Sequence, residues 1–280
     1  MATLLALFSS LLWGTADYHG GNLSKKYPAI AVLGVTQAIG LIFGIILVLI
    51  TGEFSANAFG TDGYFIPGAL AGVLGYFGLI CLYAGLATGR MGVVAPISAL
   101  SALIPVAYAF FIKGDRLSVV LSIGAALAIL GAFLASGPEL SQGLPIKPLI
   151  LALGAALGFG TSLLWMAIGS QGSPLMTMVM MRTTTLFVSL AILLKFRTLG
   201  GLRLRLAPIL IFIGCADFLA NLLLGIATTK GSLTLAMVLG ALYPIFTAGL
   251  AFRFLNERLH RVQYIGVFAA VAGVAIISAF

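Results

Sequence analysis

Three charged side chains interrupt long apolar runs of this 280-residue chain and are the first candidates for chemistry. Arg182 lies inside MVMMRTTTLFVSL, Asp217 lies inside IGCADFLANLLLG, and Asp17 follows LLWGTA near the N-terminus. A charged side chain at the centre of a bilayer costs about 2.5–3.5 kcal/mol on insertion scales. Arg182, close to the middle of its run, is therefore expected to face a cavity or a partner.

Arg182 and Asp217 lie at similar depths in consecutive apolar runs, which predicts an ion pair between them. Asn221 follows Asp217 by one helical turn on the same face. Two interpretations stay open. The pair joins two helices, or it takes part in binding a solute or a coupling ion. A double substitution that exchanges the two charges would separate these interpretations.

Asp17 lies four residues after Trp13, so both side chains share one helix face, and Thr15 lies between them. A carboxylate in a low-dielectric site favours its protonated form and can carry a proton. The alternative is a carboxylate near the membrane interface that is solvated or paired with Lys25 or Lys26. The position of Asp17 toward the end of its apolar run favours this interfacial alternative.

The composition identifies the solvent around these charges. Hydrophobic residues make up 61% of the chain and charged residues 8%, against about 45–50% and about 25% in soluble domains. So few charges cannot cover a soluble protein of this size, so the lipid bilayer is the expected partner. The net charge of +8 comes from scattered basic residues, which is typical of topology signals and not of a nucleic-acid site.

Runs of about 20 apolar residues, separated by short polar breaks, predict ten transmembrane helices. The predicted spans are 3–23, 29–50, 64–87, 92–112, 117–136, 148–168, 174–195, 207–228, 232–252 and 262–279. The predicted fold class is therefore an all-α integral membrane protein.

The second half of the chain repeats the first. Residues 89–136 slide onto 231–278 without a gap, and WGT at Trp13 lines up with FGT at Phe159. This duplication predicts two five-helix repeats. Their predicted bounds are 1–137 and 148–280, with a linker at 138–147. Because five is odd, the second repeat must enter the membrane inverted relative to the first.

The distribution of basic residues supports this inversion, because such residues favour the cytoplasmic side. Odd-numbered loops contain Lys25, Lys26, Arg90, Lys147, Lys195, Arg197, Arg203, Arg205, Arg253, Arg258 and Arg261, whereas even-numbered loops contain Lys113, Arg116 and Lys230. The odd-numbered loops are therefore expected in the cytoplasm, and both termini are expected outside.

Short motifs accompany the repeat. LLWGTADY stands at 11–18, and GDRL at 114–117 and NERL at 256–259 precede the last run of each half. With the repeat period and the loop positions, these motifs make the chain resemble the EamA-type transporters of the drug/metabolite transporter superfamily over essentially its whole length. The resemblance implies a ten-helix secondary transporter with a central cavity between the repeats. It also implies a solute such as an amino acid, another metabolite, a drug or a sugar derivative.

Prolines interrupt corresponding runs of the two halves, with Pro96 and Pro105 in the fourth and Pro244 in the ninth. Family members often have a proline at the Pro244 position, where the first half has Ala102. Such interruptions free backbone carbonyls, which need a cavity, and they point to a transporter's binding or gating site. The alternative is a kink that only shapes packing. The other candidate cavity residues are Tyr76, Tyr83, Ser98, Ser101, Thr161, Trp165 and Tyr243.

Glycines four residues apart recur in several runs and predict close helix packing. The pairs are Gly40 with Gly44, Gly68 with Gly72, and Gly154 with Gly158.

Together these patterns predict a multi-pass protein of the cell membrane that exports a small organic metabolite or amphipathic solute by alternating access. Asp17 and Asp217 are the candidates for coupling to protons. The alternative is an integral membrane enzyme acting on a lipid, which needs a catalytic cluster at one interface. The two histidines and seven acidic residues are scattered, so no catalytic residue is named. No cofactor, metal or nucleic-acid partner is expected.

Overall fold

The computed structural model describes residues 1–54, 57–60, 62–111, 119–120, 122–124, 126–127, 130–131, 134, 146–196, 201–231, 233–256 and 260–279. All regular secondary structure in these ranges is helical. The helices with both ends in these ranges are α1 (Ala2–Ser24), α2 (Ala29–Thr51), α3 (Phe65–Thr88), α4 (Met91–Ser98), η1 (Ala99–Ala102), α5 (Leu103–Phe111), α7 (Lys147–Gly172), α8 (Pro174–Phe196), η2 (Leu204–Leu206), α9 (Ala207–Lys230), α10 (Leu233–Gly240), α11 (Tyr243–Phe254) and α12 (Arg261–Ala279). Half of the predicted span 117–136 lies outside the described residues.

Local sequence explains where α2 begins and ends. Pro28 precedes the helix in an extended conformation, where its missing N–H costs no helical hydrogen bond. Gly52 follows the helix with φ of 68°, and its N–H donates to the carbonyl of Val48. Glycine tolerates this left-handed conformation, which satisfies a carbonyl that the helix end would otherwise leave free.

The fourth and ninth predicted spans are each broken. The fourth consists of α4, η1 and α5, and the 3₁₀ turn at Ala99–Ala102 follows Pro96, which lies inside α4. The ninth consists of α10 and α11, and Pro244 lies in the first turn of α11. A proline inside a helix removes a backbone hydrogen bond, whereas one in the first turn does not. The interruptions predicted from the prolines are therefore present in both halves.

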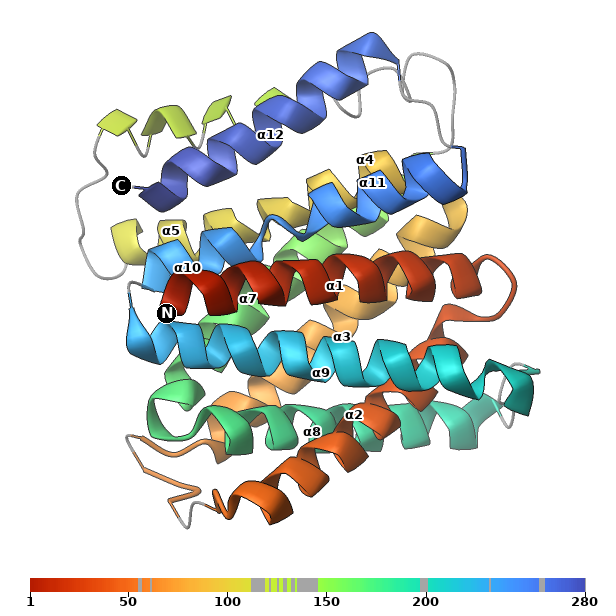
Figure 1. Cartoon of the computed structure of the whole chain (residues 1–280), viewed down its shortest axis with the longest axis vertical. Coiled ribbons are helices and arrows are strands. Elements are labelled where there is room, and N and C mark those ends of the chain that lie inside the picture. Colours follow the sequence, from red (N-terminus) through yellow and green to blue (C-terminus); the bar gives the residue numbers. More distant parts are fainter. Residues whose placement is uncertain are drawn as a thin grey trace.

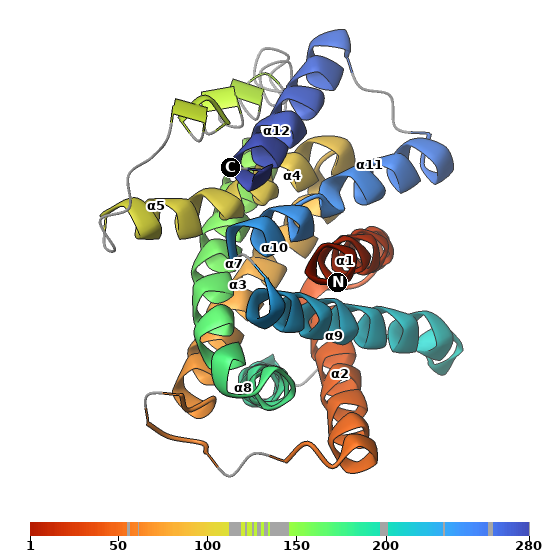
Figure 2. The ribbon, with the colours of Figure 1, turned by 60° about the vertical axis from the view of Figure 1, so that its left-hand side comes forward.

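Helices from the two halves of the chain pack against each other throughout the bundle. Helix α3 lies along α7, α1 along α9, α8 against both α2 and α3, and α4 against α11. Figure 1 shows α1 between α9 and α11, and Figure 2, in which α1 and α8 are seen nearly end on, shows α9 between α1 and α2. The interior of the bundle is therefore a seam between residues distant in sequence.

Glycine pairs allow the closest of these approaches. A Cβ added at Gly158 would lie 2.7 Å from the Cα of Gly78, and one added at Gly72 would lie 2.7 Å from the carbonyl oxygen of Met181. No side chain fits at such distances, so α3 can lie this close to α7 and α8 only through glycine. The packing role predicted for these glycines is confirmed.

The distribution of polar and apolar side chains over the described residues is typical of a membrane protein. Buried residues include Asp17, Gln37, Arg182 and Asp217, whereas large apolar side chains such as Leu49 are exposed. Five of the described helices are long and apolar enough to cross a membrane. They are Ala29–Thr51, Phe65–Thr88, Lys147–Gly172, Pro174–Ile192 and Leu204–Lys230. The all-helical class is confirmed, and the count of ten spans stays a prediction.

Candidate functional site

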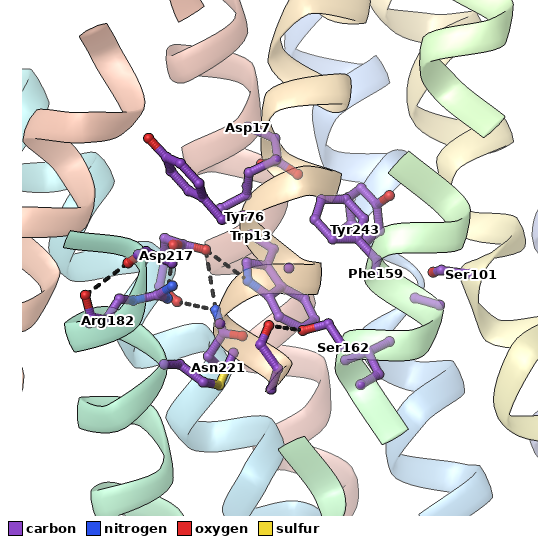
Figure 3. A pocket seen from close by; sticks show the side chains of 18 residues that line it. Trp13, Asp17, Tyr76, Ser101, Phe159, Ser162, Arg182, Asp217, Asn221 and Tyr243 are labelled. Carbon is purple, nitrogen blue, oxygen red and sulfur yellow. Dashed lines mark hydrogen bonds and ion pairs between the residues drawn. The ribbon is translucent and has the colours of Figure 1, made fainter. Parts of the chain in front are cut away.

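A cavity lies in the seam between the two halves of the chain (Figure 3). Its walls come from α1, α3, η1, α7, α8, α9 and α11, and from the turn between α10 and α11. Small-molecule sites in helical bundles occur preferentially between the helices. This cavity, which lies between helices of both halves, is therefore the candidate binding site.

An ion pair forms one side of this cavity. Nη2 of Arg182 on α8 lies 2.9 Å from Oδ2 of Asp217 on α9, and the two side chains are 4% and 7% exposed. Both residues lie near the middle of their helices. The ion pair expected from their depths in the sequence is therefore present. Burying one of these charges without the other would carry a large desolvation cost.

Gln37 of α2 bridges the two members of the pair and was not identified from the sequence. Its Oε1 accepts a hydrogen bond from Nη1 of Arg182 at 2.7 Å, and its Nε2 donates to Oδ2 of Asp217 at 3.1 Å. Thr185 donates to the same Oε1 at 3.4 Å. An amide inside the apolar run 29–50 carries the signal that singled out Arg182, because an unpaired polar group in lipid is costly.

The other carboxylate oxygen of Asp217 is also occupied. Nε1 of Trp13 on α1 donates to Oδ1 at 3.1 Å, and Nδ2 of Asn221 donates to it at 3.2 Å. The Asn221 amide also donates to the backbone carbonyl of Asp217 at 2.7 Å. Asp217 thus joins α1, α2, α8 and α9 in a single network (Figure 3). Because its acceptor sites face donors of the protein, its charge is compensated within the wall.

The carboxylate of Asp17 differs from that of Asp217 in its surroundings. It is 5% exposed, lines the cavity, and makes no hydrogen bond or ion pair with any residue that the structure describes. The interfacial interpretation, with pairing to Lys25 or Lys26, is therefore wrong. The reason is that α1 continues to Ser24 and packs against α3, α9 and α11, which places Asp17 inside the bundle. Asp17 and Trp13, four residues apart, both line the cavity from α1 (Figure 3).

The two broken helices meet beside this cavity. The hydroxyl groups of Ser98 on α4 and Tyr243 on α11 lie 2.5 Å apart. The ring of Tyr243 packs edge-on against Trp13, with 6.3 Å between ring centroids. Thr247, one turn further along α11, donates to the carbonyl of Gly14 at 3.1 Å. These contacts attach the break in α10–α11 to both the break after α4 and the polar face of α1.

Eight of the residues proposed from the sequence line the cavity together. They are Trp13, Asp17, Tyr76, Ser101, Arg182, Asp217, Asn221 and Tyr243. The alignment of 89–136 with 231–278 pairs Ser101 with Tyr243, so this position lines the cavity in both halves.

Five proposed residues do not line the cavity. Thr15 and Thr161 donate to carbonyls of the preceding turn of their own helices, at Leu11 and Leu157. Tyr83 and Trp165 belong to two apolar clusters, and Ser98 contacts the cavity only through Tyr243.

Of the three proposed gating prolines, Pro244 directly follows the lining residue Tyr243, and Pro96 lies in α4, before the 3₁₀ turn that contains the lining residue Ser101. Pro105 lies in α5, four residues after Ser101. Their role in gating stays a prediction.

Helix α7 turns a face toward the cavity that was not expected. Phe159, Ser162 and Leu163 line it, with the spacing of one helical face. The hydroxyl of Ser162 donates to the carbonyl of Ala71 at 2.7 Å, so its proton is already bound within the protein. The alignment of WGT with FGT contained a signal for this face, since it pairs Trp13 with Phe159 and, in the same register, Asp17 with Leu163.

No group of three or more His, Cys, Asp or Glu side chains in the part of the chain that the structure describes is arranged to hold a metal ion.

Comparisons with known proteins agree with this architecture. The profile of the EamA-like transporter family matches residues 1–137 and 146–279. A structure described as "Crystal structure of protein" superposes with a TM-score of 0.75 at 18% sequence identity, covering 99% of this chain and 96% of the other. At this identity the likeness concerns the fold alone. The comparison with curated proteins found no match. Because the family profile covers nearly the whole chain in two repeats, this protein belongs to the EamA-like transporter family and is a membrane transporter of the drug/metabolite transporter superfamily.

Proposed function

We propose that this protein is a secondary transporter that exports a small organic solute across the cell membrane, driven by the proton gradient. The solute occupies the cavity between the two halves of the chain, and the halves expose it to each side in turn. The observation that carries the proposal is a buried carboxylate, Asp17, which has no partner among the described residues and faces a cavity inside an apolar bundle. Polar cavities at the seam between repeats, beside broken helices, are typical of secondary transporters.

The broken helices support the alternating-access part of this proposal. Helices α4 and α10–α11 are interrupted at aligned positions, and Ser98 and Tyr243 connect the two interruptions. Breaks of this kind let short segments move without disrupting a whole helix. In the proposed cycle this hydroxyl contact is lost and remade as the halves rock against each other.

Asp17 is the proposed carrier of the coupling proton. The titratable and charged groups around it are Asp217 and Arg182 across the cavity, Tyr76 and Tyr83 on α3, and Tyr243 on α11. Arg182 is already paired with Asp217, so it does not hold Asp17 in its ionised form through an ion pair. A buried carboxylate in these surroundings can bind and release a proton as the cavity opens to each side.

Purified protein in liposomes tests both parts of the proposal. Labelled amino acids, amines and other metabolites are screened for movement under an imposed pH gradient. Asp17→Asn and Asp217→Asn are each expected to abolish the gradient-driven component, whereas Glu53→Gln, an exposed acid outside the cavity, keeps it. Unchanged transport and unchanged pH dependence in both cavity variants would rule out proton coupling through these carboxylates.

The proposed orientation places both termini outside and inverts the second half relative to the first. Glu53 and Leu204, both exposed, then lie on opposite sides of the membrane. Single cysteines at these positions, in a chain without Cys81 and Cys215, should react with a membrane-impermeant reagent from opposite sides. Labelling of both cysteines from the same side contradicts the inversion.

A further inference from the structure

The charges that line the cavity do not cancel. The described lining contains three charged side chains, Asp17, Arg182 and Asp217. The guanidinium of Arg182 is compensated by Asp217 at 2.9 Å. With both carboxylates ionised, the cavity therefore has a net negative charge, and that charge lies on Asp17.

Arg182 is not available to an anionic solute. Its Nη1 donates to Gln37 and its Nη2 faces Asp217. Nε has no hydrogen-bond partner among the described residues, but it is buried and turned toward α2, where a Cβ added at Gly40 would lie 3.4 Å from it. A carboxylate or phosphate group entering the cavity therefore finds no free cationic side chain in the described lining.

Asp17, by contrast, offers a binding site for a positively charged group. Its side chain is buried and lacks a partner among the described residues. Burial of an ionised carboxylate is costly unless an opposite charge compensates it. A cation placed beside Asp17 would supply this compensation without disturbing the network around Asp217.

Aromatic side chains surround the same space. Trp13, Tyr76, Tyr243 and Phe159 all line the cavity together with Asp17, and Trp13 lies one helical turn before Asp17 on α1 (Figure 3). The indole N–H of Trp13 is bound to Asp217 and its ring packs against Tyr243, so its orientation is held from two sides. Aromatic faces attract cations, including quaternary ammonium groups, when the cation lies within about 6 Å of the ring centre.

The geometry points to an organic cation as the solute, an amine or quaternary ammonium group on an apolar body, with its charge at Asp17 and its body against the aromatic walls. This inference rests on the proposed transport function and specifies its substrate class. It excludes carboxylates, phosphates and other anions as preferred solutes, because the described cavity has no cation left to bind them.

Binding to the purified full-length protein tests the assignment without transport. Trp165→Phe leaves Trp13 as the single tryptophan, so fluorescence reports from the cavity. The probes share one ring: benzyltrimethylammonium, benzyl alcohol, phenylalanine and phenylacetate, which are a permanent cation, a neutral molecule, a zwitterion and an anion. We expect the cation to bind at least about tenfold more tightly than each of the others, which is the scale of one charge-assisted contact.

Substitutions of Asp17 sharpen this test. Asp17→Asn should weaken benzyltrimethylammonium binding by at least about tenfold, Asp17→Glu should retain it, and Glu53→Gln should leave it unchanged. Thermal unfolding of each variant confirms that it is folded. Equal or tighter binding of phenylacetate or phenylalanine, or unchanged cation binding in folded Asp17→Asn, overturns the inference.

Transport of the same probes separates this inference from the proposed function. Binding of the cation without movement through proteoliposomes would refute transport and leave the cation site in place. Movement of a zwitterion or anion that is indifferent to Asp17→Asn would refute the cation assignment and leave the transport function in place.

Discussion

Helices α1 and α7 begin the two halves of the chain and face the same cavity, but only α1 brings charge to it. Trp13 and Asp17 line the cavity from α1, and Phe159 and Leu163 line it from α7 at the aligned positions. An aromatic residue is kept in both helices, whereas the carboxylate has an apolar counterpart. The duplicated scaffold therefore preserves which positions face the cavity, while the chemistry at those positions has diverged.

The helices against which α1 and α7 pack also differ, because one contributes polar side chains and the other contributes glycine. Helix α1 packs along α9, where Asp217 and Asn221 join a hydrogen-bonded network. Helix α7 packs along α3, where Gly78 and Gly158 bring the two backbones together. One side of the cavity is thus held by polar contacts and the other by close packing. The difference indicates how an amphipathic solute would be oriented, with its charge toward α1 and its body toward α7.

Exchanging the two aligned residues should have the largest effect on transport. Asp17→Leu is expected to reduce uptake into proteoliposomes by at least about tenfold, the scale of a lost charge-assisted contact. The double variant Asp17→Leu with Leu163→Asp should not restore uptake, because the aligned aromatic residue on α7 is Phe159, which has no N–H like that of Trp13 to bind the Asp217 network. Full recovery in the double variant would mean that the α1 and α7 faces are interchangeable.

Breaking the ion pair on the polar side should have the next largest effect, and it acts on stability. Arg182→Met leaves Asp217 buried without its counter-charge, which costs about 3–5 kcal/mol in comparable buried pairs. Adding Asp217→Leu removes the orphaned charge and should recover part of the loss. The measurement is unfolding in detergent by heat or denaturant. Equal stability of Arg182→Met and the parent would show that the pair contributes nothing to the fold.

Crowding the closely packed side should destabilise the protein less. Gly158→Ala would bring a Cβ to 2.7 Å from Gly78 and push α7 away from α3, at a cost of about 1–3 kcal/mol for overpacking. Gly249→Ala is the matched control, because a Cβ there meets no atom within 4 Å. The two unfolding midpoints are compared under the same conditions. A similar midpoint for both variants would contradict the close approach of α3 and α7.

The hydroxyl contact between the broken helices should have the smallest effect on stability. Tyr243→Phe removes the partner of Ser98, which keeps its hydrogen bond to the carbonyl of Ala95 at 2.7 Å. The expected loss is about 0.5–1.5 kcal/mol, the net value of one hydrogen bond. Transport rates should change more than stability, since the contact lies at the proposed hinge. Tyr108→Phe, on an exposed residue of α5, is the control.

The ion pair shows how much of the site could be predicted from sequence. Arg182 and Asp217 were identified because charges inside apolar runs are rare and costly, and the structure joins them at 2.9 Å. Gln37 carries a weaker form of the same signal and was missed. Trp165 and Thr161 were proposed on the face of α7 that the structure turns away from the cavity. The direction of a helix face could not be predicted, because lipid-facing and protein-facing sides of a membrane helix are both apolar.

The sequence by itself determined the class of the protein, the breaks in the fourth and ninth runs, and the pairing of Arg182 with Asp217. Each follows from a local energetic cost that holds in any arrangement of the helices. The chain has too few charged residues for a water-exposed surface, proline lacks the N–H of a helical hydrogen bond, and an unpaired charge in the bilayer is unfavourable. Only the tertiary structure decided that Asp17 is buried without a partner among the described residues, because this depends on how α3, α9 and α11 pack around α1. Helix packing, and not residue type, separates a carboxylate that faces a cavity from one that faces water.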